Sequence, residues 1–179
     1  PLGDEKFRSS SFMHHNDMVA FYRPRATIAQ TDIPAFYYRL AEDPDENPVP
    51  EFPWHWVWVE SRTPYIYQNI HGHDVLVSST WPGFRDEKLI MRNIIKPDPQ
   101  SFLASRARYL VVHLNLESEE KNVILNRPKL SKEDFHKSFQ ELSQSGTKMA
   151  VLLEHKWGKP EFTDESIKVW DLKKIRQQF

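Results

Sequence analysis

The chain has 179 residues, a net charge of −1 and no cysteine. This length is enough for one domain with its own core. The absence of cysteine excludes disulfides, thiolate catalysis and zinc–thiolate sites, and the absence of a basic stripe argues against nucleic acid as a partner. No apolar run approaches the length of about 18 residues that a membrane-spanning helix needs.

The N-terminal third begins with a polar, irregular stretch, residues 1–25, that predicts an extended arm. A short strand at 26–30 is followed by a proline-started helix, because Thr31-Asp32 can cap it and Pro34 suits its first turn. Apolar residues at spacing i, i+1, i+4 form the buried stripe of this helix: Phe36, Tyr37 and Leu40. A rigid, proline-rich loop over 43–50 then leads to the next element.

The segment PWHWVWVE at 53–60 alternates strictly and is apolar on nearly both faces. This pattern is typical of an interior strand that is covered on both sides. Three tryptophans share one face of it: Trp54, Trp56 and Trp58. A core strand is the commoner explanation, because large rings dominate core burial, and a platform that stacks on sugars is the alternative.

Further helices and strands follow in alternation. Thr63-Pro64 begins a helix that Gly72 can end, and a strand is predicted at 74–78. Two helices are predicted next, at 85–95 and from Asp98-Pro99 onward, and a buried central strand is predicted at 109–116. The remaining elements are a charged connection at 117–129, a helix from Ser131 to Gly146, a strand at 148–154, a closing hairpin at 161–170 and a docking or frayed tail helix.

This order predicts an α/β fold with a layered, mostly parallel (mixed) sheet, helices on both faces and a C-terminal antiparallel hairpin. The domain organisation that follows is an N-terminal arm at 1–25, a single α/β domain at 26–172 and a C-terminal tail at 173–179.

Common catalytic motifs are missing from the chain. It has no glycine-rich phosphate loop, no G-x-S-x-G elbow and no H-E-x-x-H. Three acids lie near predicted strand ends, where a glycosidase could use them: Glu51, Glu60 and Glu117. Nothing pairs them, so we expect them to be solvated.

A metal site is a weaker alternative. His71 and His73 alternate on an extended segment and Asp74 follows them, so their side chains could converge on one ion. A further ligand would have to come from elsewhere, for example His113 on the central strand. The competing interpretation is that His71 fixes the junction between helix and strand while His73 is solvated. We expect no cofactor.

A series of short blocks resembles the extracytoplasmic C-terminal region of bacterial polytopic membrane proteins related to GT-C glycosyltransferases, of the dolichyl-phosphate-mannose or aminoarabinose transferase type. The blocks are Leu40–Pro44, Glu51-Phe52-Pro53, Tyr65–His73, Ala107–His113 and Trp157–Leu172, and their shared order carries the resemblance. Two features depart from the family pattern. His73 replaces the family's lysine after His-Gly, and Ser78-Ser79-Thr80 replaces its glycine-rich continuation.

The resemblance implies an accessory domain, non-catalytic by itself, on the periplasmic face of a bacterial inner membrane. Its partners would be the membrane-embedded remainder of the same protein and a glycan or polyprenyl-linked sugar. A stand-alone carbohydrate-binding module and a metal-dependent hydrolase remain alternatives. The candidate ligand-binding residues are Tyr65, Tyr67, Gln68, His71, His113 and Trp56. An equally simple alternative is that Tyr67, Gln68 and His71 form a buried hydrogen-bond network.

Overall fold

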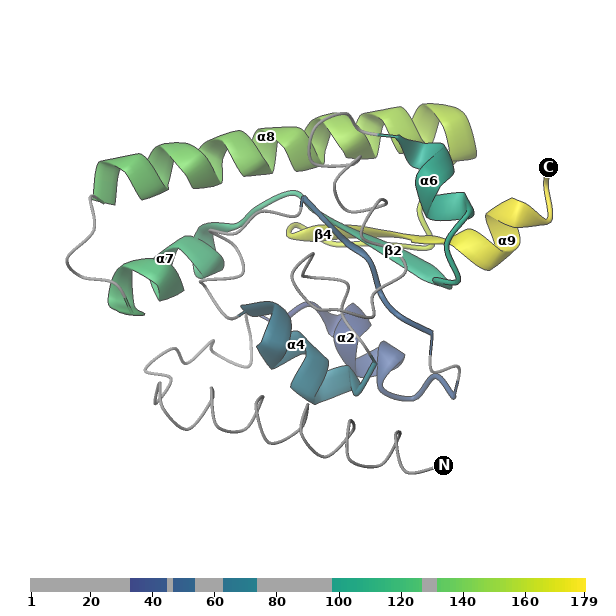
Figure 1. Ribbon diagram of the computed structural model, residues 1–179, viewed down its shortest axis with the longest axis horizontal. Coiled ribbons are helices and arrows are strands. Elements are labelled where there is room, and N and C mark those ends of the chain that lie inside the picture. Colours follow the sequence, from purple (N-terminus) through teal and green to yellow (C-terminus); the bar gives the residue numbers. More distant parts are fainter. Residues whose placement is uncertain (1–32, 45–46, 54–62, 74–97, 127–131) are drawn as a thin grey trace, which may run out of the picture.

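The computed structural model describes residues 33–44, 47–53, 63–73, 98–126 and 132–179. These residues form an α/β fold around one open four-stranded sheet of order β1-β2-β4-β3 (Figure 1). The elements in chain order are α2 (Ala35–Leu40), β1 (Glu51–Phe52), α4 (Thr63–His71), α6 (Pro99–Leu103), β2 (Tyr109–His113), α7 (Glu117–Asn126), α8 (Lys132–Trp157), β3 (Phe162–Thr163), β4 (Ile167–Asp171) and α9 (Leu172–Arg176).

The sheet is mixed, as predicted. β1 pairs in parallel with β2, whereas the other two pairs, β2 with β4 and β3 with β4, are antiparallel. Parallel pairing among the described strands is therefore confined to β1 and β2. The predicted C-terminal hairpin is β3–β4, and the predicted central strand is β2, which has a neighbour on each side.

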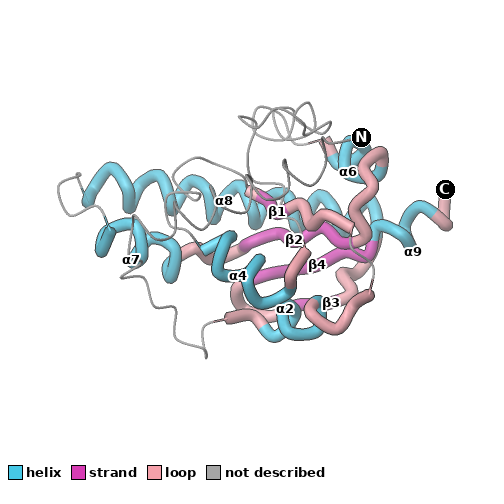
Figure 2. Tube along the Cα trace, turned by 60° about the horizontal axis from the view of Figure 1, so that its bottom comes forward, coloured by secondary structure: helices cyan, strands magenta, loops and turns pink. Residues whose placement is uncertain are grey.

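Helices cover both faces of the sheet, as Figures 1 and 2 show. The alternation along β2 assigns its side chains to the two faces. Leu110 and Val112 pack in a core cluster with residues of α6, α8 and α9. Val111 packs in a second cluster with residues of α2 and α4. His113 follows Val111 by two residues and therefore points to the same side, toward α2 and α4.

The long helix α8 corrects two predictions. Neither the helix end at Gly146 nor the strand at 148–154 exists, because α8 runs without a break from Lys132 to Trp157. Gly146 instead allows close contact: a β-carbon built on it would overlap the backbone carbonyl of His113. The glycine that does end the helix is Gly158, which has a φ of +84° and whose N–H donates to Glu154 O over 3.0 Å.

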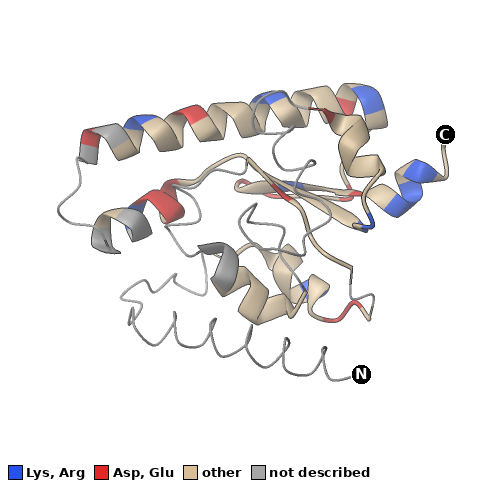
Figure 3. Ribbon diagram, in the orientation of Figure 1, with Lys and Arg blue, Asp and Glu red and all other residues tan. Residues whose placement is uncertain are grey.

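The charged segment that was predicted as a connection is also helical. α7 spans Glu117–Asn126, and its first turn carries Glu117, Glu119 and Glu120 (Figure 3). Acidic side chains at a helix N-terminus interact favourably with the helix dipole. The side-chain oxygen of Asn115 accepts the backbone N–H of Glu117 over 2.9 Å. The charges that suggested a connection therefore belong to the start of a helix.

The tail helix α9 docks on the domain. Leu172 and Ile175 are buried in the α8-side core, and the guanidinium of Arg176 donates to the carbonyls of Leu103, Ser105 and Ala107 at 2.8 Å each. Asp171 caps the helix through the N–H groups of residues 173 and 174. The tail is thus a docked helix with its own anchoring contacts.

Several predicted elements lie outside the described residues: the arm at 1–25, the strands at 26–30 and 74–78, the helix at 85–95, and all but the first residue of the strand at 53–60. Within the described ranges, no helix combines the length and the apolar character that crossing a membrane requires.

Candidate functional site

Four nearly parallel rings form a stack beneath the sheet, on the side of α2 and α4. The ring of Tyr37 lies 4.1 Å from that of Tyr67 and 5.7 Å from that of His71, and the ring of Tyr67 lies 6.1 Å from that of His113, with interplanar angles of 14–20°. All four residues are buried. The stack joins α2, α4 and β2, so it fixes the position of α4 against the sheet.

A buried acid–imidazole pair lies at one end of this stack. Nε2 of His113 is 2.8 Å from Oε2 of Glu51, and their side chains are 1% and 0% exposed. The Tyr37 hydroxyl is 3.4 Å from the same Nε2. The prediction that Glu51 is solvated is therefore wrong, because the parallel pairing of β1 with β2 places Glu51 beside the central strand, opposite Val111.

A second buried acid, Glu119, extends from the first turn of α7. The Tyr67 hydroxyl donates to Oε1 of Glu119 over 3.2 Å. Burial raises the pKa of Glu119, although His113 partly offsets that effect. Burial and the neighbouring carboxyls also raise the pKa of Tyr67 and of Tyr37 well above the ordinary tyrosine value, so both hydroxyls keep their protons.

His71 and His73 stabilise the turn of the chain at Gly72, where α4 ends. The N–H of His73 donates to Nδ1 of His71 over 3.0 Å. The ring nitrogens of His73 lie 2.9 Å and 3.3 Å from the carbonyls of Leu40 and Asn47. Gly72 between them has a φ of +75°, as expected for the residue that ends α4. His73 is therefore buried rather than solvated, and backbone groups hold it.

We expect the loss of folding stability at acidic pH to depend on His71. Burial and the nearby His73 lower the pKa of His71 from 6.5 to about 4. The unfolded chain then binds more protons between these values, so stability falls as the pH falls through that window, by about 3 kcal/mol in total. His71→Asn cannot titrate, and its side-chain oxygen can still accept the His73 N–H. Urea unfolding from pH 7 to 4.5 should show a shallower loss for this variant than for the wild type.

The control for that prediction is His155→Asn, which changes an exposed histidine near the end of α8. It should reproduce the wild-type pH dependence. Equal slopes for His71→Asn and the wild type would contradict the assigned role of His71.

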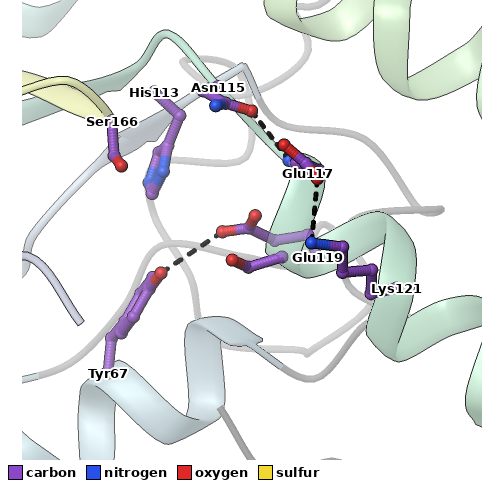
Figure 4. Close-up of a pocket in the computed structure, with 8 residues that line it drawn as sticks. Tyr67, His113, Asn115, Glu117, Glu119, Lys121 and Ser166 are labelled. Carbon is purple, nitrogen blue, oxygen red and sulfur yellow. Dashed lines mark hydrogen bonds and ion pairs between the residues drawn. The ribbon is translucent and has the colours of Figure 1, made fainter. Parts of the chain in front are cut away.

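A cavity of about 210 Å³ opens beside the buried network (Figure 4). Its lining comes from four parts of the fold: α4, the end of β2 with the turn after it, α7 and the β3–β4 turn. The lining residues are Tyr67, His113, Asn115, Glu117, Ser118, Glu119, Lys121 and Ser166. Glu119 is only 2% exposed, yet it lines this cavity. Glu117 and Lys121 form an exposed ion pair of 2.8 Å at the same site.

The structure brings together only some of the predicted site residues. Tyr67 and His113 line the cavity, whereas His71 is buried in the ring stack and Gln68 is half-buried on α4. The side chain of Tyr65 and the whole of Trp56 and Asp74 lie outside the described part of the chain. No group of three potential metal ligands occurs among the described residues, so the metal alternative gains no support from His71, His73 and His113.

Sequence reasoning missed the residues that complete the cavity: Asn115, Ser118, Glu119, Lys121 and Ser166. One signal for them was available. Asn115 stands directly before an acidic triplet, a pattern that favours a helix start. If a helix had been predicted at 117–126, its geometry would have predicted that Glu119 faces the sheet. The position of Ser166 depends on how the hairpin folds back onto β2, which no local pattern shows.

No protein-family model, no curated protein and no solved structure matches this chain. The function must therefore be argued from the site itself and from the order of the sequence blocks.

Proposed function

We propose that this chain is an extracytoplasmic accessory domain of a GT-C-like membrane protein, and that it binds a sugar group in the cavity between Tyr67 and Glu119. The bound group would belong to a glycan or to a polyprenyl-linked sugar. The ordered sequence blocks support the membrane protein as the parent. The observation that carries the binding proposal is the lining of the cavity, which combines carboxyl, amide and hydroxyl groups.

The chemistry of this lining suits a polyhydroxylated ligand. Carboxylates accept from sugar hydroxyls, and the Asn115 amide and the Ser118 and Ser166 hydroxyls can donate and accept. The ring of Tyr67 adds an apolar surface. The volume of about 210 Å³ is smaller than the 300–1,000 Å³ typical of sites for drug-sized ligands. It therefore suits one small group, such as a single sugar ring.

The hydrogen bonds already present favour binding over catalysis. Asn115 supports the start of α7, Glu117 pairs with Lys121, and Glu119 accepts from Tyr67. These contacts hold Asn115, Glu117 and Glu119 in place at the wall of the cavity. A site of this kind presents fixed groups to a ligand, which lowers the entropic cost of binding.

A pocket-filling variant tests the binding proposal. The purified chain would be titrated by NMR with methyl α-D-glucopyranoside and methyl α-D-mannopyranoside. We expect a Kd on the order of 1 mM for at least one of them, which corresponds to about 4 kcal/mol. Ser118→Phe places a ring in the cavity from α7 and should weaken binding more than tenfold.

The matched control is Ser145→Phe, the same change at an exposed position of α8. It should bind as the wild type does. Binding that survives Ser118→Phe would remove the cavity as the site and would favour the alternative that the sequence offers, a sugar platform formed by Trp54, Trp56 and Trp58. The proposed parent is tested separately by the reading frame upstream of Pro1, which should encode about ten apolar runs of about 20 residues.

A further inference from the structure

We propose that Glu119 recognises its ligand as a neutral carboxylic acid, so that the cavity prefers uncharged sugars and takes up a proton when one binds. This inference rests on the proposed sugar-binding function and adds the ligand class and the pH response of the same site. It is carried by the position of a buried acid at the wall of a cavity.

The geometry leaves one carboxyl oxygen for the ligand. The Tyr67 hydroxyl donates to Oε1 of Glu119, so that oxygen acts as an acceptor. Figure 4 shows the second oxygen directed away from Tyr67, on the side of Asn115. A neutral carboxyl carries its proton on this second oxygen and can donate it to an oxygen of the ligand.

Burial and the nearby Glu51 favour the neutral form of Glu119, whereas His113, the backbone N–H of Glu119 itself and the Tyr67 hydroxyl favour the charged form. Titratable or charged groups face or influence it from several elements: Tyr67 on α4, Tyr37 on α2, Glu51 on β1, His113 on β2, and Glu117 and Lys121 on α7 itself. Asp164, in the β3–β4 turn, influences Tyr67. On the α8 side, His136 pairs with Glu120, 2.8 Å away, and not with Glu119. Burial is the largest influence, and it raises the pKa of Glu119.

A bound ligand would strengthen this preference. It displaces water from the cavity, which disfavours the charged carboxylate further, and its oxygen accepts the acid proton. Above the pKa of the ligand-free site, binding then requires uptake of one proton, and affinity falls by up to tenfold for each pH unit. Anionic sugars are disfavoured as well, because the acidic residues Glu51 and Glu117 lie at this end of the sheet while Lys121 is held by Glu117.

The experiment compares the wild type with Glu119→Gln, using methyl α-D-glucopyranoside, methyl α-D-mannopyranoside and D-glucuronic acid as probes. Titration calorimetry from pH 5 to 8, in two buffers of different ionisation enthalpy, reports both the Kd and the protons taken up. For the wild type we expect affinity to fall with rising pH, proton uptake on binding and weaker binding of glucuronic acid. The amide of Glu119→Gln donates as the neutral acid does, so this variant should keep the low-pH affinity at every pH.

The control variant is Glu141→Gln, an exposed glutamate of α8, which should keep the wild-type pH dependence. Wild-type binding that is independent of pH, or a Glu119→Gln variant that folds but does not bind, overturns this inference and leaves sugar binding standing. No binding of any probe by either protein at any pH overturns the proposed function, and this inference with it. Proton uptake is measured on the wild type alone. The inference can therefore still be tested if the Glu119→Gln protein does not fold.

Discussion

Replacing Gly146 with alanine is expected to destabilise the fold by about 3 kcal/mol or more. A β-carbon at this position would overlap the backbone carbonyl of His113, and neither a helix nor a central strand can move aside as a flexible side chain would. Overpacking of this kind forces backbone shifts, which cost about 1–3 kcal/mol and more where the backbone itself is the obstacle. Urea unfolding of the wild type and of Gly146→Ala would measure the difference in the free energy of unfolding.

Two control variants separate this effect from ordinary glycine effects. Ser145→Ala changes the adjacent, exposed residue of α8 and should stay within about 0.5 kcal/mol of the wild type. Gly158→Ala removes a glycine with φ +84° but with no neighbouring atom in the way, so it should cost about 1–2 kcal/mol. A Gly146→Ala protein as stable as the wild type would show that α8 does not contact β2 in this way.

Gly146 also explains why the second half of α8 was predicted as a helix end followed by a strand at 148–154. A glycine after an apolar stripe reads as a helix end, and the following KMAVLLE reads equally well as a strand, because periodicity cannot assign short apolar runs. The buried stripe nevertheless continues through the glycine at helical spacing: Phe135, Phe139, Gly146, Met149, Ala150, Leu153 and Trp157. The sequence therefore does indicate one continuous helix, but this becomes visible only when the apolar stripe is traced over about seven turns.

Elements with strong local signals were predicted correctly. The helix from Thr63 to Gly72 has a proline start and a glycine end, Asp98 caps α6 through the Gln100 N–H, and the β-branched run of β2 is buried. In each case, the residues that define the element are neighbours in the chain. In such elements the local chemistry agrees with the global fold, so the sequence pattern alone is enough to predict them.

The candidate site was only half predictable because its parts are distant in sequence. Tyr67 and His113 stood out as polar residues of apolar elements, and both line the cavity. Glu119 did not stand out, because one glutamate in ESEEK resembles the others. Its burial follows from the contact of α7 with the end of β2 and from the hydrogen bond of Tyr67, 52 residues away. Such pairings depend on the topology of the whole domain.

Glu51 illustrates the same point, and its replacement should have the second large effect on stability. Its side chain is fully buried, and Oε2 lies 2.8 Å from Nε2 of His113. Removing one partner of a buried acid–imidazole pair leaves the other in a low-dielectric environment without that hydrogen bond, which costs about 3–5 kcal/mol. We therefore expect Glu51→Ala to lower the free energy of unfolding by about that amount in urea or thermal unfolding.

The variant Glu51→Gln separates the contribution of the carboxyl group from that of the side-chain volume. Glutamine has nearly the same volume and keeps one acceptor oxygen for His113, so it should lose less stability than alanine. Glu154→Ala removes a surface partner of Lys168 and should cost below about 1 kcal/mol, as exposed pairs do. If Glu51→Ala cost no more than Glu154→Ala, the Glu51–His113 pair would not stabilise the end of the sheet. The ring stack and the hydrophobic clusters would then hold His113 in place without it.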